Sequence, residues 1–390
     1  MARKKNKIRD DGRYAVQVYL GLDENGKRRY KTVYGRTQAE AELKAQDMKV
    51  AMRKGLDINA DRDTFGDWAK RWLKIKTPEV SHGQIAAYIP RIDYINNFIH
   101  DAHITKLKAV DLQDIINSLA ENNPNTGQPA SKQVLKLTKS TISQIFSLAI
   151  ENRVLDYNPA IAIKLPKNAT VHKRRALTEE EQQWIRTTDH RAKRAAMIMM
   201  YAGLRRGELI PLTWNDINLK DKTINVYKSV ERISNPFILK DGVKTDAGVR
   251  TVDIPDILVE FLKTENRGEI LVCEKVSGGM HTDSSWKRMW DSYLTELNIT
   301  HGNFSPFHKQ PKSKFSHNKP FVIENITPHM LRHTFATLLY FAGVDILTAK
   351  EQLGHSDIKM TMQIYTHLDK IHKRKSMSRL DDYLNEQKVI

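Results

Sequence analysis

Six side chains in the C-terminal half could together perform chemistry on a phosphate. They are two arginines, one lysine, two histidines and one tyrosine: Arg205, Lys244, His329, Arg332, His355 and Tyr365. Arginine forks can hold the nonbridging oxygens of a phosphodiester, and histidines can donate hydrogen bonds or accept a proton. A lysine can protonate a leaving oxygen, and a tyrosine can attack phosphorus to form an ester. This combination predicts phosphoryl transfer without a metal.

Each of these residues also has an ordinary structural explanation. Arg205 and Arg206 could be a surface pair, and Lys244 could be a solvated lysine in a hairpin. His355 follows a glycine typical of a helix end, and Tyr365 could be a buried helix aromatic. The combination of all six residue types in one basic chain favours the catalytic interpretation.

The charge of the chain indicates a polyanionic partner. The 390 residues hold 63 Lys and Arg against 46 Asp and Glu, a formal net charge of +17. An excess of this size favours nucleic acid or an acidic membrane face. The single cysteine, Cys273, excludes an internal disulfide and a CxxC zinc knuckle. No signal peptide and no membrane span are expected, so the sequence predicts a soluble intracellular protein.

The first piece, residues 1–58, is predicted to be a small antiparallel sheet followed by one helix. Residues 14–20 and 30–34 alternate as strands do, around a turn at 23–26. The helix from about Thr37 would place Ala39, Leu43 and Met48 on its apolar side. Because a small sheet can enter the major groove, we expect this basic piece to bind DNA through Lys27, Arg28 and Arg29.

The second piece, residues 63–166, is predicted to be an all-helical bundle. Thr64 and Asp67 have the spacing of a capping box, and helical patterns follow near 82–99, 109–120 and 131–152. The linker at 167–176 is basic, and Lys164 lies three residues before it, so we expect both to follow a phosphate backbone. The cations concerned are Lys164, Lys167, Lys173, Arg174 and Arg175.

The third piece, residues 177–390, is predicted to be mixed and mainly helical. Helical patterns lie near 179–188, 191–202, 284–297, 328–342, 345–353 and 358–366, with another after Arg205, and strand-like stretches at 223–231 and 249–254. Thr178 and Glu181 have the spacing of a capping box, and Thr327 followed by Pro328 is typical of a helix start. Residues 301–320 have little periodicity and indicate an exposed loop. Its histidines His301, His308 and His317 are spaced too widely for a metal site, so no cofactor is expected. The expected fold class is therefore multidomain α+β.

The third piece resembles the catalytic domain of the tyrosine recombinases, the phage integrase family. Residues 202–209, AGLRRGEL, are similar to the first-arginine box, and HMLRHTFA at 329–336 resembles the HxxR box. LGH at 353–355 resembles the next box, with Tyr365 following at the family's usual interval. Lys244-Thr245, followed by Arg250-Thr251-Val252, resembles the β-hairpin lysine motif, although Lys240 could be the lysine instead.

The resemblance assigns a role to each box. It implies that Tyr365 is the nucleophile, that Lys244 protonates the leaving 5′-hydroxyl, and that Glu208 supports the site. Arg205, Arg332, His329 and His355 would stabilise the transition state. It also implies a helical core-binding domain, an arm-binding domain at 1–58 and a catalytic domain that includes the tail 370–390.

Partners and rival activities follow from the same resemblance. It implies an integrase of a temperate phage or conjugative transposon that acts as a tetramer on core and arm DNA sites. An excisionase and a DNA-bending host protein are implied as accessory partners. The resemblance also implies the cytoplasm of a bacterial host cell as the location, in association with the nucleoid. The tail 370–390 could pack in cis or on a neighbouring protomer. A type IB topoisomerase and a catalytically silent DNA-binding regulator are the alternatives, and a membrane-surface protein is disfavoured.

Overall fold

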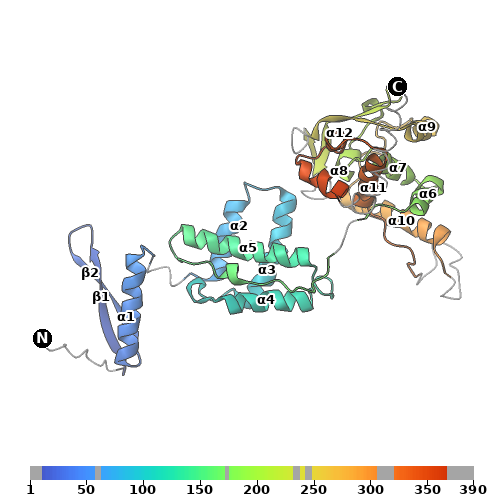
Figure 1. Ribbon diagram of the computed structural model, residues 1–390. Helices are drawn as coiled ribbons and strands as arrows, with labels where there is room; N and C mark the ends of the chain where they lie inside the picture. Colours follow the sequence, from blue (N-terminus) through green and yellow to red (C-terminus); the bar gives the residue numbers. More distant parts are fainter. Residues whose placement is uncertain are drawn as a thin grey trace, which may run out of the picture. The chain divides into compact units, whose positions relative to one another are not determined.

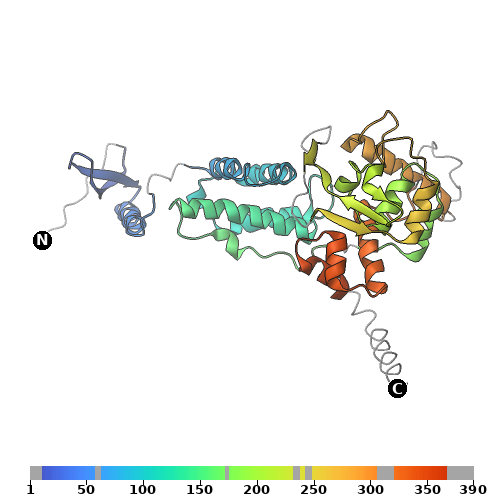
Figure 2. The ribbon, with the colours of Figure 1, turned by 90° about the horizontal axis from the view of Figure 1, so that it is seen from above.

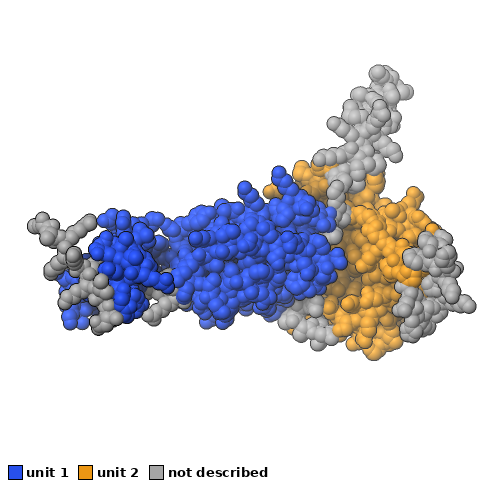
Figure 3. All heavy atoms as spheres, turned by 90° about the horizontal axis from the view of Figure 1, so that it is seen from below, with its two compact units in different colours: residues 1–172 blue, residues 173–390 orange. Residues whose placement is uncertain are grey.

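The chain, whose helices and strands are labelled in Figure 1, forms two compact units that divide after His172 (Figure 3). The computed structural model describes residues 11–57, 63–171, 175–231, 238–241, 248–304 and 320–366. Its mixture of helices with small antiparallel sheets confirms the predicted α+β class. The division falls inside the predicted linker at 167–176, whereas the finer separation of 1–58 from 63–166 stays a prediction. No helix within the described residues is both long and apolar enough to cross a membrane.

The N-terminal hairpin has the turn that its sequence predicts. β1 (Tyr14–Leu22) pairs antiparallel with β2 (Arg28–Gly35), and Asp23 accepts hydrogen bonds from the backbone of Asn25 and Lys27 within the turn. α1 (Gln38–Arg53) follows and packs against both strands (Figure 2).

The prediction of which side of α1 is buried is wrong. The helix buries Ala41 and Ala45, whereas Leu43 is exposed. The strand and helix approach so closely at Gly35 that a Cβ there would meet the backbone of Ala41. Only small side chains fit such an approach, so shape outweighs hydrophobicity in choosing the buried face.

The first unit also contains the predicted bundle. Its helices are α2 (Phe65–Lys76), α3 (His82–Ile99), α4 (Ala109–Glu121) and α5 (Lys132–Glu151). The capping box at Thr64 and Asp67 is present, with hydrogen bonds in both directions. Trp68 and Trp72 lie one turn apart on α2 and are buried in the core with Phe146. These four helices confirm the periodicity read from residues 63–166.

The second unit surrounds small sheets with helices. The helices are α6 (Glu179–Thr187), α7 (Lys193–Tyr201), α8 (Arg206–Leu209), α9 (Asp256–Thr264), α10 (Asp283–His301), α11 (Pro328–Phe341) and α12 (Ile346–Leu353). The strands are β3 (Ile217–Asn218), β4 (Thr223–Val226), β5 (Lys228–Glu231), β6 (Ile238–Asp241) and β7 (Arg250–Asp253). They form a sheet of order β3-β4-β7 and a separate hairpin β5-β6. Of these helices, α9 escaped prediction.

Packing between distant segments brings the sequence boxes together. α11 packs on α7, and α12 packs on both α11 and β7. α8 packs against β5. Residues near 205, 250, 332 and 355 therefore converge although they are far apart in the sequence. Figure 1 shows α8, α11 and α12 side by side in the second unit.

Candidate active site

Arg205 sits at the start of α8 and is held by the acid three residues later. Its backbone N–H donates to Glu208 Oε2 over 2.9 Å, and its Nη1 donates to Glu208 Oε1 over 2.6 Å. Its Nη2 donates to the carbonyl of Gly354, 2.8 Å away. The Arg205 side chain is still 37% exposed, whereas that of Glu208 is 2% exposed. A buried carboxylate thus fixes a guanidinium that can still reach a ligand from solvent.

Arg332 enters the same region from α11. Thr327 caps this helix and Pro328 begins it, as predicted. The guanidinium of Arg332 is buried and donates to the carbonyls of Gly203 and Leu353. Two carbonyls occupy two of its five N–H donors, which leaves donors for an anion.

Two glycines of the boxes are required by close packing. Gly203 has φ +64°, and a Cβ there would collide with the ring of Phe335. Gly354 has φ +59° as the cap of α12, and a Cβ there would lie 2.8 Å from the guanidinium of Arg250. Both residues combine a left-handed backbone with no space for a side chain.

His355 completes the group from the loop after α12. It is buried, and its Nδ1 lies 2.8 Å from Oγ1 of Thr361, a contact that orients the ring. Burial, with the charges of Arg332 and Arg205, lowers the pKa of His355 to about 4. The imidazole is therefore neutral near pH 7 and can accept a hydrogen bond.

The low pKa of His355 should make stability depend on pH. The unfolded side chain binds a proton below its ordinary pKa of 6.5, whereas the folded one stays neutral down to about pH 4. The free energy of unfolding should therefore fall as pH drops from 6.5 to 4, by about 3 kcal/mol for this residue. Denaturant titrations at a series of pH values measure this free energy. Between pH 6.5 and 4 it should fall more steeply for wild type than for His355→Gln. The same pH dependence in both proteins would contradict the lowered pKa of His355.

Arg250 is a site residue that the prediction missed. It contacts Glu208 through Nη2 at 2.9 Å and Nη1 at 3.3 Å. Burial alone would raise the pKa of Glu208, but its hydrogen bond to Arg250 and the charges of Arg250 and Arg205 hold the pKa below its usual value. The signal was available, because Arg250 stands in the RTV stretch after the lysine motif. Thr361 carried no comparable signal.

The assembled group is strongly electropositive. Three guanidinium groups, of Arg205, Arg250 and Arg332, surround the single carboxylate of Glu208. Burial lowers the pKa of Arg332 to about 9, and the neighbouring Arg205 contributes to this shift. This pKa is still well above 7, so Arg332 stays charged and the group offers a fixed positive field to a bound phosphate.

Tyr365 lies in the helical segment 358–366, and its hydroxyl makes a different contact. It donates to the carbonyl of Val344 over 3.1 Å, and its ring packs edge-on against Tyr340. Burial and the nearby charge of Asp345 raise the pKa of Tyr365 to about 12. The phenol is therefore protonated, and its hydroxyl points to a backbone carbonyl.

The remaining predicted catalytic residues are placed less completely. His329 lies in the first turn of α11 and is exposed. Lys244 falls outside the described residues. Lys240 belongs to β6, opposite Ser229 of β5. The choice between the two lysines therefore stays open.

The predicted DNA-binding cations outside the catalytic group divide into two kinds. Lys27, Arg28, Arg29, Lys164 and Lys167 are exposed, while Lys173 and Arg174 lie outside the described residues. Arg175 differs, because its guanidinium forms a two-pronged contact with Glu181 and a further bond to Glu324. Its charge is therefore largely engaged within the protein.

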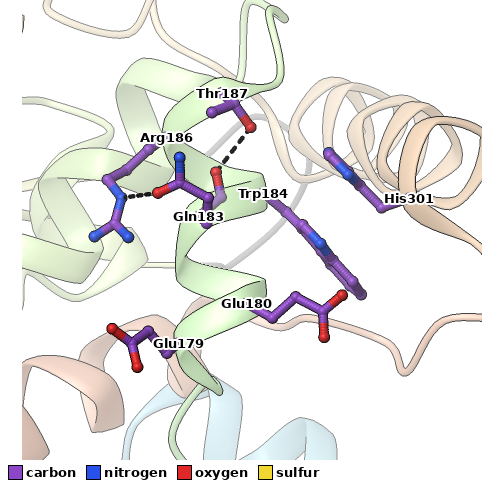
Figure 4. A pocket seen from close by; sticks show the side chains of 7 residues that line it. All are labelled: Glu179, Glu180, Gln183, Trp184, Arg186, Thr187 and His301. Atoms are coloured by element: carbon purple, nitrogen blue, oxygen red, sulfur yellow. Dashed lines mark hydrogen bonds between the residues drawn. The ribbon is translucent and has the colours of Figure 1, made fainter.

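A separate hollow on the second unit has unsuitable chemistry for a phosphate. It is lined by Glu179, Glu180, Gln183, Trp184, Arg186, Thr187 and His301 (Figure 4). His301 was expected in an exposed loop, but it is the last residue of α10 and its ring stacks on Trp184. Exposed carboxylates of Glu179 and Glu180 border the hollow, so it repels an anion. Over the parts of the chain that the structure describes, no three His, Cys, Asp or Glu side chains gather as metal ligands do.

Comparison with known proteins agrees with this geometry. The phage integrase family matches residues 171–372. A XerC-like tyrosine recombinase of Caldanaerobacter subterraneus subsp. tengcongensis is 27% identical, with 98% of this chain and 99% of that protein covered. The Tn1549 transposon integrase, solved with circular intermediate DNA, shares the fold with a TM-score of 0.65, at 20% identity over 81% of this chain and 99% of that one. A lambda integrase tetramer on a Holliday junction gives a TM-score of 0.53, at 19% identity over 91% and 96% of the two chains.

The fold and the arginine–histidine group thus define a tyrosine recombinase. The chain belongs to the phage integrase family, and its match covers more than half of the sequence. It is an enzyme, and its activity is site-specific DNA recombination.

Proposed function

We propose that this protein cuts and rejoins DNA through a covalent bond between Tyr365 and a 3′-phosphate. The observation that carries this proposal is the convergence of Arg205, Arg332 and His355 at the end of α12, where the adjacent carbonyls of Leu353 and Gly354 accept from Arg332 and Arg205 and His355 follows directly. Such a site binds an anion and stabilises charge that develops on its equatorial oxygens. The substrate would be double-stranded DNA that carries the attachment sites of a phage or conjugative transposon.

The proposed cleavage step is balanced without a cofactor. The phenol oxygen of Tyr365 attacks phosphorus, the bond from phosphorus to the 5′-oxygen breaks, and a 3′-phosphotyrosine forms. The phenol loses its proton to His355 as the bond to phosphorus forms, because the negative charge of the bound phosphate offsets the arginine charges that lower the pKa of His355. Lys244 gives a proton to the leaving 5′-oxygen. The tyrosine hydroxyl must first leave the carbonyl of Val344, because one proton cannot serve both contacts.

Strand exchange would repeat the chemistry in reverse. The free 5′-hydroxyl of a partner duplex attacks the phosphotyrosine, releases Tyr365 and restores the diester on a new strand. Two such exchanges pass through a Holliday junction, and four protomers would act together. Excisionase and a DNA-bending host protein are the accessory partners we expect, and the cell interior is the expected location.

The N-terminal hairpin would hold a second DNA segment. Its register pairs Tyr19 with Tyr30, and both rings are about half exposed on the strands. Arg28 and Arg29 are exposed at the start of β2. A two-stranded ribbon fits the major groove, with cations beside it for phosphates.

The experiment that tests the proposal uses nicked duplexes that carry candidate attachment sites. Wild-type protein should form a covalent adduct that resists denaturant, cleave the DNA at fixed positions and join two different duplexes. Relaxation of supercoiled plasmid without any joined product would instead support a type IB topoisomerase. Binding without an adduct would support a silent regulator and contradict the proposal.

A further inference from the structure

Arg250 is the most fully bonded side chain of the active-site group, although no catalytic role was predicted for it from the sequence. Its side chain is 6% exposed at the start of β7. Besides both oxygens of Glu208, its Nε donates to the carbonyl of Gln352 over 3.0 Å and its Nη1 to that of Gly248 over 3.2 Å. One guanidinium therefore ties together α8, the last turn of α12 and the chain that leads into β7.

Arg250 and Arg205 share both of their anchors. Glu208 accepts hydrogen bonds from each arginine. The carbonyls at the end of α12 are also divided between them, with Gln352 bonded to Arg250 and Gly354 bonded to Arg205. All three guanidinium nitrogens of Arg250 already donate inside the protein, whereas Arg205 is partly exposed, so we expect Arg250 to act on a ligand through Arg205.

Stability alone gives a poor account of this arrangement. Removing a guanidinium from water costs several kcal/mol, and apolar side chains of similar size often stabilise a core as well as a buried ion pair does. The packing is also tight, because a Cβ at Gly354 would lie within 3.0 Å of several guanidinium atoms of Arg250. What a rigid, fully bonded fork supplies is a fixed position for its partners.

We propose that Arg250 is a positioning residue for Arg205, a role that rests on the proposed function above. It fixes the carboxylate of Glu208 and the end of α12. These two anchors then aim the Arg205 guanidinium at the nonbridging oxygens of the scissile phosphate. The ligand concerned is the anionic phosphodiester itself, and Arg250 does not touch it.

The test compares two substrates that differ in charge at the cleaved phosphorus. One is a normal nicked duplex, and the other carries a methylphosphonate, in which a methyl group replaces one nonbridging oxygen. The methylphosphonate linkage is uncharged, so less negative charge develops in its transition state and less stabilisation by arginine is needed. Arg250→Met removes the guanidinium. Arg250→Lys keeps the positive charge but reaches fewer acceptors, and it serves as the test variant if Arg250→Met does not fold.

Both variants should cleave the normal duplex more slowly, by about 10- to 100-fold, the usual range for residues that orient a site indirectly. On the methylphosphonate the loss should shrink to less than about 5-fold. Affinity for the duplex should stay close to that of wild type, because Arg250 is buried.

Arg194 provides the matched control. It is another largely buried arginine, bonded to Glu265 at 2.5 Å and to the carbonyl of Val272 at 2.8 Å. Arg194→Met should lower the melting temperature without changing the ratio of the two cleavage rates.

The failures can be told apart. Equal loss on both substrates, or no loss on either, overturns the positioning role while leaving the proposed function intact. Wild-type protein that forms no covalent adduct overturns the proposed function and the positioning role with it.

Discussion

Replacing Tyr365 by phenylalanine should abolish the covalent protein–DNA adduct and all joined products. The phenol oxygen is the atom that would bond to phosphorus, and the substitution removes that atom while keeping the ring. The folded protein loses one hydrogen bond, from Tyr365 to the carbonyl of Val344, which costs about 1 kcal/mol. DNA binding should therefore survive. Denaturing gels of reactions on nicked duplexes measure the adduct, and native gels measure binding.

Tyr340 offers a matched control for this variant. Its ring packs against that of Tyr365, with centroids 5.1 Å apart, so it shares the same surroundings. Tyr340→Phe should still form the adduct. If Tyr365→Phe were trapped on DNA and Tyr340→Phe were not, the nucleophile would be Tyr340 and the proposed route would be wrong.

Arg205→Lys should slow cleavage by about 100- to 1000-fold, the range found when one preorganised donor is removed from a transition-state site. Lysine keeps the positive charge but lacks the planar fork. It cannot hold Glu208 and the carbonyl of Gly354 and still present parallel donors to a phosphate. Single-turnover cleavage of a nicked duplex measures the loss.

The adjacent residue gives the control. Arg206 is similarly exposed, at 39%, and pairs with Asp283 at 3.2 Å rather than with the catalytic group. Arg206→Lys should cleave DNA at a rate close to that of wild type. Equal losses at the two positions would mean that general positive charge, and not the fork of Arg205, is what the reaction needs.

Features that depend on neighbouring residues were predictable from the sequence. The capping boxes at Thr64 and Thr178, the proline at the start of α11 and the glycine at the end of α12 all lie where local rules put them. Periodicity also located the two strands and helix of the first piece. These signals are local because capping and strand alternation involve residues only a few positions apart.

Contacts between side chains that are far apart in the sequence were less predictable. The buried side of α1 was mistaken because close approach of the strand selects alanine over leucine. The engagement of Arg175 by Glu181 and Glu324 was also invisible, since Glu324 lies 149 residues away. Such contacts depend on packing between distant segments, which composition and spacing do not encode.

The sequence by itself determined the chemistry available: a basic chain whose arginine, histidine and tyrosine boxes belong to a strand-transferring enzyme. The tertiary structure decided how those groups are held. It buried Glu208 between Arg205 and Arg250, lowered the pKa of His355, and left the Tyr365 hydroxyl on the carbonyl of Val344. The physical reason is that burial and charge act through space, so a pKa or a hydrogen-bond partner exists only after the chain has folded.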